Sequence, residues 1–234
     1  TIRTGEPERL GPGPSMPPAG NFHITDDHLG EGGPKEKYRR NVEAIRTLKA
    51  IELEGRGATE AEQEVLSRYV GWGGLPQVFD QDKEDWHTEY AELKEAGLDR
   101  IHSGFETGSD AVLQKINKGV TQQQEITAGK NIKAGGIELS VYFMPGVGGK
   151  ELTKENAEGT SHVINEIGPD FLRIRTAAVK PGTGLYEDYQ SGQLTLCSDE
   201  EKLLEIRTVI ERAPEIDTRV VSDHIINLLQ GVEG

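Results

Sequence analysis

The stretch IHSGFETGSD, residues 101–110, decides the fold class, because a strand-like pattern ends there in a carboxylate between two glycines and a helix start at Ser109. The same order of strand and loop returns in IELSVYFMPGVGG, residues 137–149, and in DFLRIRTAAVKPGTG, residues 170–184, and TRVVSD at 218–223 predicts a fourth strand. Helices are predicted at 109–117, 121–134, 153–167 and 198–212. This alternation predicts an α/β fold with a parallel sheet, either open or part of a barrel.

The loops that follow the first three predicted strands should lie together, because the carboxyl ends of parallel strands meet at one rim. In the first loop, the Glu106 carboxylate can accept hydrogen bonds from ribose hydroxyls or an ammonium group. Glycines allow a ligand to approach the backbone, and N–H groups at the start of the Ser109 helix favour an anion. Each loop alone is typical of a simple turn, but three on one rim favour a small-molecule pocket.

Two arginines of the third predicted strand point to the face opposite its aliphatic residues. They are Arg173 and Arg175, and in a barrel with outer helices that face is the interior. An interior guanidinium needs a carboxylate or phosphate partner because it stays charged. An internal ion pair, for instance with Glu106 or Glu138, and a contact to substrate both remain open.

The first 92 residues have a different pattern. Residues 1–21 hold five prolines and four glycines with little apolar content, so a disordered tail is predicted. A helical segment at 22–92 follows, and the α/β part occupies 93–234. The first helix lies between Pro34 and Gly55, with an inward face of Tyr38, Val42, Ile45, Leu48 and Ile51.

Capping boxes predict where three helices begin. TEAE at Thr59, TQQQ at Thr121 and SDEE at Ser198 each place Glu or Gln three residues after a hydroxyl side chain. Helical spacing then predicts two inward faces, Val65, Leu66 and Tyr69 after the first box and Leu203, Ile206 and Ile210 after the last.

Composition and charge argue against two classes of binding partner, nucleic acid and membrane. The net charge is -14, which argues against general affinity for nucleic acid, and no apolar run approaches the ~18 residues of a membrane span. A single cysteine, Cys197, suits a reducing cytoplasm, so a cytoplasmic location is expected. The basic residues of 22–92 are interpreted as a solvated helix face, with nucleic-acid contact as the alternative; they are Lys35, Lys37, Arg39, Arg40, Arg46 and Lys49.

Residues 93–234 resemble the C-terminal half of a radical S-adenosylmethionine enzyme. The resemblance rests on GLDRIHSGFETGSDAVLQKINKGVT, VYFMPGVGGKE, FLRIRTAAVKPGTGLYED and VSDHIINLLQGVEG. It implies half of a TIM-type barrel with outer helices, and a rim that holds a four-iron cluster and S-adenosylmethionine. In the family, the cluster reduces S-adenosylmethionine to a deoxyadenosyl radical. The candidate cofactor-binding residues are Glu106, Thr107, Gly108, Ser109, Pro145, Gly146, Arg173 and Arg175.

The cluster motif of that family, CxxxCxxC, is absent from the sequence. Iron–sulfur clusters are held almost wholly by thiolates, so Cys197 alone cannot replace it, and we interpret Cys197 as a packed or surface thiol. The six histidines show no metal-ligand spacing, so no metal site is predicted. We therefore expect no radical chemistry from this chain and assign no catalytic residue. The alternative is a non-catalytic module that binds an adenosyl ligand or assists at nucleic acid.

A second resemblance covers residues 21–94, FHITDDHLGEGGPKEKYRRNVEAIRTLKAIELEGRGATEAEQEVLSRYVGWGGLPQVFD and its flanks. This segment resembles the N-terminal region of mobile-element proteins that combine a DNA methyltransferase with a Swi/Snf-like helicase. The two resemblances meet at 92–96 without a linker, so our hypothesis is a chimera that lacks the first strands of the barrel. The strand at 100–105 would then be an edge, and pairing of two copies there is expected as one route to a dimer.

Overall fold

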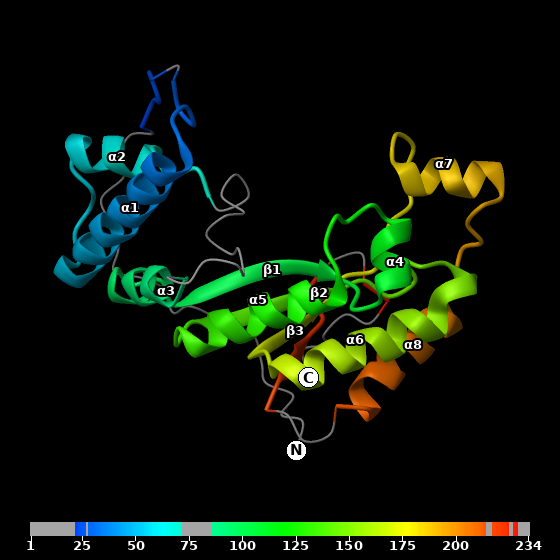
Figure 1. The fold of residues 1–234 in the computed structure, drawn as a ribbon. Coiled ribbons are helices and arrows are strands. Elements are labelled where there is room, and N and C mark those ends of the chain that lie inside the picture. Colours follow the sequence, from blue (N-terminus) through cyan, green and yellow to red (C-terminus); the bar gives the residue numbers. More distant parts are fainter. Residues whose placement is uncertain (1–21, 27, 72–85, 214–216, 225–226, 229–234) are drawn as a thin grey trace. The chain divides into compact units, whose positions relative to one another are not determined.

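The computed structural model describes residues 22–26, 28–71, 86–213, 217–224 and 227–228, so the predicted tail lies outside the described residues (Figure 1). The chain divides into two compact units. A helical unit contains the described residues up to Asp99 together with Ala134–Ile137. An α/β unit contains Arg100–Lys133 and the described residues from Glu138 onward.

The helical unit contains α1 (Pro34–Glu54), α2 (Glu60–Ser67) and α3 (Trp86–Glu95). Both predicted boundaries of α1 and the predicted start of α2 are confirmed, whereas α2 ends at Ser67, before the stop predicted at 71–74. Pro34 stands in the first turn of α1, and Gly55 ends the helix with a left-handed φ of 62°. Thr59 caps α2 through the predicted capping box with Glu62.

The inward face predicted for this unit is only partly right. Val42, Ile45 and Ile51 are buried, but Leu48 and Tyr69 are each 44% exposed. The buried Asn41 takes an inward position instead: its side chain donates to the Gly71 carbonyl at 2.8 Å and accepts from the Val70 N–H at 3.0 Å. The inward amide thus satisfies a carbonyl and an N–H of the backbone that follows α2.

The α/β unit confirms the predicted fold class. Its four strands are parallel in the order β1-β2-β3-β4, with β1 at an edge. They are β1 (Arg100–Glu106), β2 (Glu138–Phe143), β3 (Phe171–Ile174) and β4 (Arg219–Val221). The helices are α4 (Asp110–Lys115), α5 (Gln122–Ala134), α6 (Thr153–Ile167), α7 (Gly184–Ser191) and α8 (Asp199–Glu211), with a short 3₁₀ turn, η2 (Lys150–Leu152).

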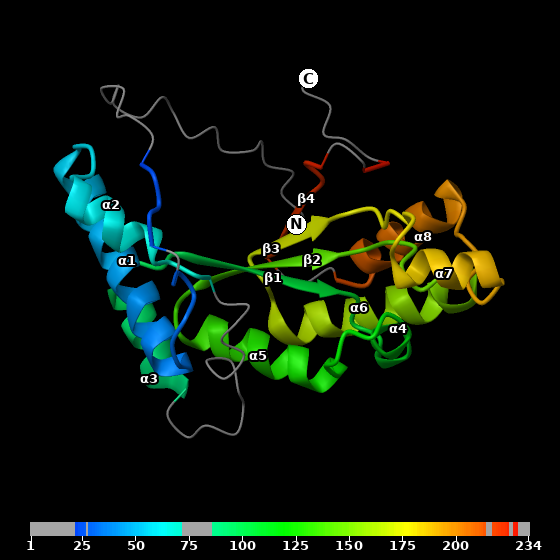
Figure 2. The ribbon, with the colours of Figure 1, turned by 90° about the horizontal axis from the view of Figure 1, so that it is seen from above.

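The two faces of this sheet differ in chemistry. One face is aliphatic and buried, with Leu139, Val141 and Leu172 at most 3% exposed, and α5 and α6 lie on one side of the sheet (Figure 2). In the parallel register, Tyr142 pairs with Arg173, so both project from the opposite face. The predicted division between aliphatic and arginine-bearing faces is therefore confirmed.

Candidate functional site at the strand ends

The loops after β1, β2 and β3 lie next to one another at the carboxyl rim of the sheet. The Met144 N–H donates to the Glu106 carbonyl at 2.8 Å, and the Arg175 N–H donates to the Phe143 carbonyl at 2.9 Å. These two bonds join the end of each strand to the next loop. The prediction that the three loops share one rim follows from the parallel order of the strands and is confirmed.

Glu106 ends β1 in an uncommon backbone conformation. Its φ is 68°, in the left-handed region that favours glycine, and the register of β1 with β2 shifts between Ser103 and Glu106. Its side chain is 24% exposed, and one carboxylate oxygen accepts from Lys118 Nζ at 3.2 Å. The structure thus presents a partly accessible carboxylate after β1 that is paired with a lysine.

The residues after Glu106 form their polar contacts within the chain. Thr107 is buried, and its hydroxyl accepts from the Ser109 N–H at 3.1 Å. The Gly108 N–H donates to Thr160 Oγ1 on α6 at 3.0 Å. Both N–H groups are therefore engaged within the chain. The expectation that N–H groups at the start of the helix favour an anion stays a prediction.

Gly108 also has a packing role. A Cβ on Gly108 would lie 2.5 Å from the Gly159 carbonyl oxygen and 2.6 Å from a Val163 methyl group on α6. A Cβ on Gly159 would in turn lie 2.8 Å from the Gly108 carbonyl oxygen. Two glycines face each other because the loop and the helix backbone are too close for side chains. This contact explains the glycine without a ligand.

The loop after β2 is held by a buried carboxyl group from α8. Pro145 is buried, and Gly146 has a φ of 81°. The Gly146 N–H and Asn156 Nδ2 on α6 each donate to Glu205 Oε2 at 2.8 Å. Glu205 is 2% exposed, and burial raises its pKa to about 7, although the bonds from Gly146 and Asn156 act in the opposite direction.

Glu205 was not predicted as a site residue. The predicted inward face of α8 contained Leu203, which is 37% exposed, whereas the structure buries Glu205, Ile206 and Val209. Glu205 precedes Val209 by four residues, so helical spacing places both on the same stripe. A glutamate on the apolar stripe of a predicted helix is the sequence signal that could have identified Glu205.

A second buried carboxyl group lies behind the loop after β1. Glu125 on α5 is 5% exposed, and neither of its carboxylate oxygens has a hydrogen-bond partner among the described residues. Burial raises its pKa to about 9; Lys118 lowers the value, and Glu106 and Asp110 raise it. At neutral pH this carboxyl group is protonated.

Arg173 forms an ion pair, one of the two alternatives that the sequence left open, but its partner is neither Glu106 nor Glu138 and is half exposed. Its Nη1 lies 2.6 Å from Asp223 Oδ2, and its Nε donates to Ser140 Oγ at 3.1 Å. Glu138, one of the suggested partners, instead pairs with Arg100 at 2.7 Å. Asp223 follows β4, whose register with β3 brings it to the same face as Arg173.

Arg175 has an aromatic neighbour. Its guanidinium carbon lies 5.2 Å from the centre of the Tyr142 ring, a cation–π geometry. The His102 ring is 6.4 Å from the same tyrosine ring, and burial, followed by Arg173 and Arg100, lowers the pKa of His102. This face of the sheet therefore carries aromatic and cationic groups that suit an anionic or planar ligand.

The residues present do not fit an iron–sulfur cluster. Cys197 is the single cysteine of the sequence, it is buried, and burial raises its pKa to about 11. A thiol in that state is the wrong form for a metal ligand. Within the described ranges, no group of three His, Cys, Asp or Glu side chains is placed to hold a metal ion. Among the same residues, no helix is long and apolar enough to cross a membrane.

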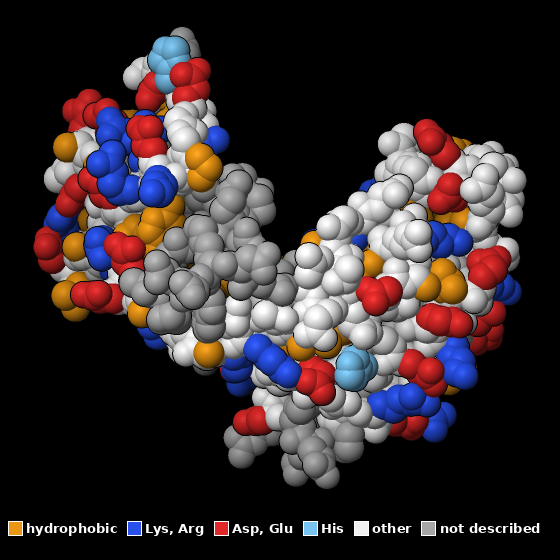
Figure 3. Space-filling model, in the orientation of Figure 1, with side chains coloured by type: hydrophobic (Ala, Val, Ile, Leu, Met, Phe, Trp, Pro, Cys, Tyr) orange, Lys and Arg blue, Asp and Glu red, His pale blue; other side chains and the backbone are white. Residues whose placement is uncertain are grey.

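Three of the basic side chains of α1 form ion pairs with acidic ones. Arg40 contacts Glu36 at 2.5 Å, and Arg46 lies 3.6 Å from Glu92. Lys49 contacts Asp99 at 2.9 Å. On the face drawn in Figure 3, Lys and Arg side chains alternate with Asp and Glu side chains over these helices. These ion pairs support the interpretation of a solvated helix face, and a nucleic-acid role stays an untested alternative.

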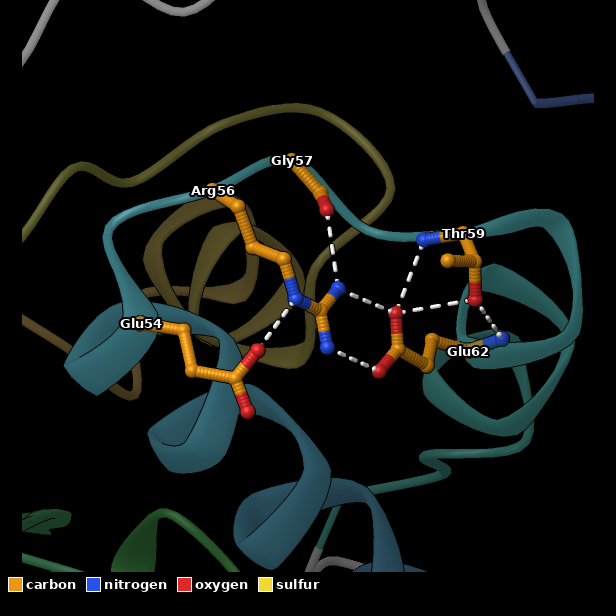
Figure 4. Close-up of polar contacts among 5 residues, drawn as sticks. All are labelled: Glu54, Arg56, Gly57, Thr59 and Glu62. Carbon is orange, nitrogen blue, oxygen red and sulfur yellow. Dashed lines mark hydrogen bonds and ion pairs between the residues drawn. The ribbon is translucent and has the colours of Figure 1, made fainter.

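The turn between α1 and α2 holds a further charged cluster (Figure 4). Two guanidinium nitrogens of Arg56 contact the two carboxylate oxygens of Glu62 at 2.7 and 2.6 Å, and Nε contacts Glu54 at 2.5 Å. The same Glu62 carboxylate accepts from the Thr59 N–H at 2.8 Å. Arg56 is the largest cause that lowers the pKa of Glu62 to about 2.

Comparison with known proteins finds no matching family model. The chain is 30% identical over 119 residues to an uncharacterized methyltransferase of Pyrococcus horikoshii, covering 51% of this chain and 26% of that protein. It is 32% identical over 127 residues to 4'-phospho-dehydrooxetanocin synthase of Priestia megaterium, covering 54% of this chain and 14% of that protein. The chain therefore spans only a small part of the length of these curated relatives.

Among solved structures, the chain is similar to Elp3 from the archaeon Methanocaldococcus infernus with its N-terminus deleted. The TM-score is 0.50 at 17% identity, covering 81% of this chain and 54% of that chain, so the likeness concerns the fold. Together the comparisons support a radical S-adenosylmethionine-like fold for the C-terminal part of the chain. The resemblance of residues 21–94 and the chimeric origin stay hypotheses.

Proposed function

We propose that the α/β unit binds the adenosyl portion of S-adenosylmethionine at its rim, without radical chemistry by the residues of this chain. The observation that carries the proposal is the bond from the Met144 N–H to the Glu106 carbonyl at 2.8 Å. It joins the backbone of Glu106 to the loop that contains Pro145 and Gly146, which the family resemblance also assigns to this ligand. The proposal extends the shared fold to a ligand, which is a step that fold similarity alone does not supply.

The chemistry of the two loops suits the two ends of such a ligand. The carboxylate of Glu106 accepts hydrogen bonds, and ribose hydroxyls or the ligand's ammonium group can donate them. Its partner Lys118, at 3.2 Å, is 30% exposed, so breaking this ion pair requires little free energy. Gly146 has no side chain and is half-buried, and the Lys202 stem lies over it, with Cγ 3.0 Å from where a Cβ would be. A flat ring would reach this backbone by displacing that flexible side chain.

Calorimetry with S-adenosylmethionine tests the ligand. We expect Glu106→Ala to weaken binding by about tenfold, the usual effect of one hydrogen bond to a charged group. The matched control is Glu200→Ala, which removes an exposed glutamate from α8 and should leave binding unchanged. Equal heats for the native chain and Glu106→Ala would remove Glu106 from the site, and no heat with the native chain would overturn the proposal.

Anaerobic reconstitution with iron and sulfide, followed by metal analysis, tests the second half of the proposal. We expect iron far below four atoms per chain, because Cys197 is buried and its pKa is raised to about 11. Cys197→Ser is the control and should retain the same small amount of iron. Stoichiometric four-iron binding that disappears in Cys197→Ser would show that the chain holds a cluster.

A further inference from the structure

Three elements of the α/β unit meet at the carboxyl group of Glu205. From α8, its Oε2 accepts from the Gly146 N–H in the loop after β2 and from Asn156 Nδ2 on α6, both at 2.8 Å. Asn156 Nδ2 also donates to the Met144 carbonyl at 3.3 Å. The amide of Gly146 and the carbonyl of Met144 therefore both depend on the pair formed by Asn156 and Glu205.

The same pair contains two oxygens that lack partners. Glu205 Oε1 and Asn156 Oδ1 are buried and have no hydrogen bond to any described residue. An ionised carboxyl group would leave Glu205 Oε1 as a buried acceptor without a donor, which is unfavourable. A proton on that oxygen supplies a donor in a cluster where Asn156 Oδ1 still needs one. The arrangement suits a neutral carboxyl group.

We infer that Glu205 is a positioning residue for the ligand loop: with Asn156, its carboxyl group holds the Met144 carbonyl and the Gly146 amide where the adenosyl group of S-adenosylmethionine packs. This inference rests on the proposed function and adds to it the residue that sets the shape of one wall of the site. Glu205 touches the loop and not the ligand, so it acts through Gly146.

The ionisable groups near Glu205 determine whether a change between pH 6 and pH 8 can be assigned to the Glu205 carboxyl group. On α8, Glu201 lies 3.3 Å from Lys150, and Lys202 pairs with Asp199 at 3.2 Å, so both have partners of opposite charge. Glu201 raises the pKa of Glu205 and Lys202 lowers it, both less than burial does. Glu205 also raises the pKa of the Cys197 thiol, less than burial does, and the resulting value of about 11 favours the neutral thiol at pH 6 and pH 8.

The test combines amide hydrogen exchange of residues 144–149 with calorimetry, at pH 6 and pH 8. Glu205→Leu should raise exchange in this segment and weaken S-adenosylmethionine binding, each by about tenfold, because the Gly146 N–H loses its acceptor. Glu205→Gln should have at both pH values the protection that the native chain has at pH 6, because an amide keeps one acceptor oxygen and cannot ionise. Glu200→Gln on the exposed side of α8 is the control.

In the native chain, the folded pKa of about 7 lies above the ordinary 4.5. Protection that depends on the proton is therefore complete below pH 4.5 and is lost as pH rises through 7. We expect the segment to exchange faster at pH 8 than at pH 6, after correction for intrinsic rates, in the native chain and not in Glu205→Gln. A segment whose protection is equal in the native chain and Glu205→Leu would overturn the inference.

The two proposals fail in different ways. If the native chain binds S-adenosylmethionine and Glu205→Leu binds it equally well, the positioning role is wrong while the proposed function stands. If no chain binds it, the proposed function is wrong and the ligand part of the inference falls with it. The exchange data then still decide whether Glu205 holds the loop.

Discussion

The loops after β1 and β2 follow neighbouring strands, and a buried carboxyl group lies near each loop. The carboxyl group near the loop after β2 accepts a hydrogen bond from that loop, whereas the one near the loop after β1 has no hydrogen-bond partner among the described residues. After β2, the buried Glu205 accepts two hydrogen bonds and ties the loop to α6 and α8. After β1, the loop is held by hydroxyl groups and by the contact of Gly108 with Gly159, and the buried Glu125 behind it has no hydrogen-bond partner among the described residues.

This difference shows how partners, and not burial alone, decide what a buried acid contributes. Burial is the largest cause of the raised pKa in both, but the value is about 9 for Glu125 and about 7 for Glu205. The bonds from Gly146 and Asn156 favour the ionised form of Glu205 and account for its smaller shift. We therefore expect the buried carboxyl group of Glu125 to lower the free energy of unfolding without holding a described segment in place. Glu205 instead holds the loop after β2 through the Gly146 N–H.

The largest expected effect comes from removal of Glu125. Glu125→Met should raise the free energy of unfolding at pH 8 by on the order of 3 kcal/mol, because an unpartnered acid is replaced by an apolar side chain of similar length. The folded pKa of about 9 exceeds the ordinary 4.5, so the native chain loses stability as pH rises between them. Urea unfolding at pH 5 and pH 8 should show a gain that is larger at pH 8.

Glu205→Met is the matched comparison for that experiment. It removes the acceptor of the Gly146 N–H and of Asn156 Nδ2, so the relief of the buried acid is offset by two donors without partners. We expect a smaller gain than for Glu125→Met, or a loss. Equal gains at the two positions would mean that the hydrogen bonds of Glu205 contribute nothing and would remove the distinction between the loops.

The second prediction concerns how the loop after β1 is held. Gly108→Ala places a methyl group 2.5 Å from the Gly159 carbonyl oxygen, so either the loop or α6 must move. We expect a loss of about 1–3 kcal/mol in the free energy of unfolding, typical of overpacking. Gly184→Ala is the control, because its Cβ has no neighbour within 4 Å. Equal stability of the two variants would contradict the close packing of the loop on α6.

Much of the fold could be predicted because local signals and topology agree. The capping boxes at Thr59 and Ser198 are both formed, and the helix predicted at 153–167 has those bounds. The shared rim followed from alternating strands and helices, which bring the loops together whatever their side chains are. These predictions needed only short-range sequence patterns and the rule for parallel sheets.

The partners of the buried charges could not be predicted in the same way. Glu205 meets Gly146, 59 residues earlier in the chain, and Arg173 meets Asp223, 50 residues later. Such pairs depend on the rotation of α8 and on the register of β4, and a helix with adjacent leucines such as Leu203 and Leu204 does not fix its rotation to one residue. The sequence therefore left an ion pair and a substrate contact open for Arg173 and did not identify Asp223 as its acid.

The third prediction extends the comparison to the end of β3. Arg173→Met should lower the free energy of unfolding by about 1 kcal/mol, because it leaves Asp223 and the Ser140 hydroxyl without their guanidinium partner. Arg175→Met should have less effect, since it removes a contact 5.2 Å above the Tyr142 ring. Thermal unfolding of both variants decides the order, and a larger effect for Arg175 would reverse the assignment of Arg173 as the structural residue.

A double variant isolates the ion pair. Asp223→Asn removes the negative charge, so Arg173→Met should be less harmful in that background than in the native chain. Additive effects of the two changes would show that Asp223, which is 49% exposed, contributes nothing to the stability of this face. Arg173 would then be available to a ligand, like Arg175.

The smallest effect concerns a carboxyl group near the surface, whose side chain is 25% exposed. Glu62 has a pKa of about 2, chiefly because Arg56 bonds to it, and the shift from 4.5 is opposite in sign to that of Glu205. Its contribution is therefore present above pH 4.5 and is lost as pH falls through 2, whereas that of Glu205 is lost as pH rises. Carboxyl NMR titration of Arg56→Gln should return the Glu62 midpoint toward 4.5, with Arg68→Gln, which contacts Glu64, as the control. An unchanged midpoint would mean that the hydrogen bonds from Thr59, and not Arg56, lower the pKa of Glu62. Backbone N–H donors would then lower carboxyl pKa values in both units, at Glu62 and at Glu205.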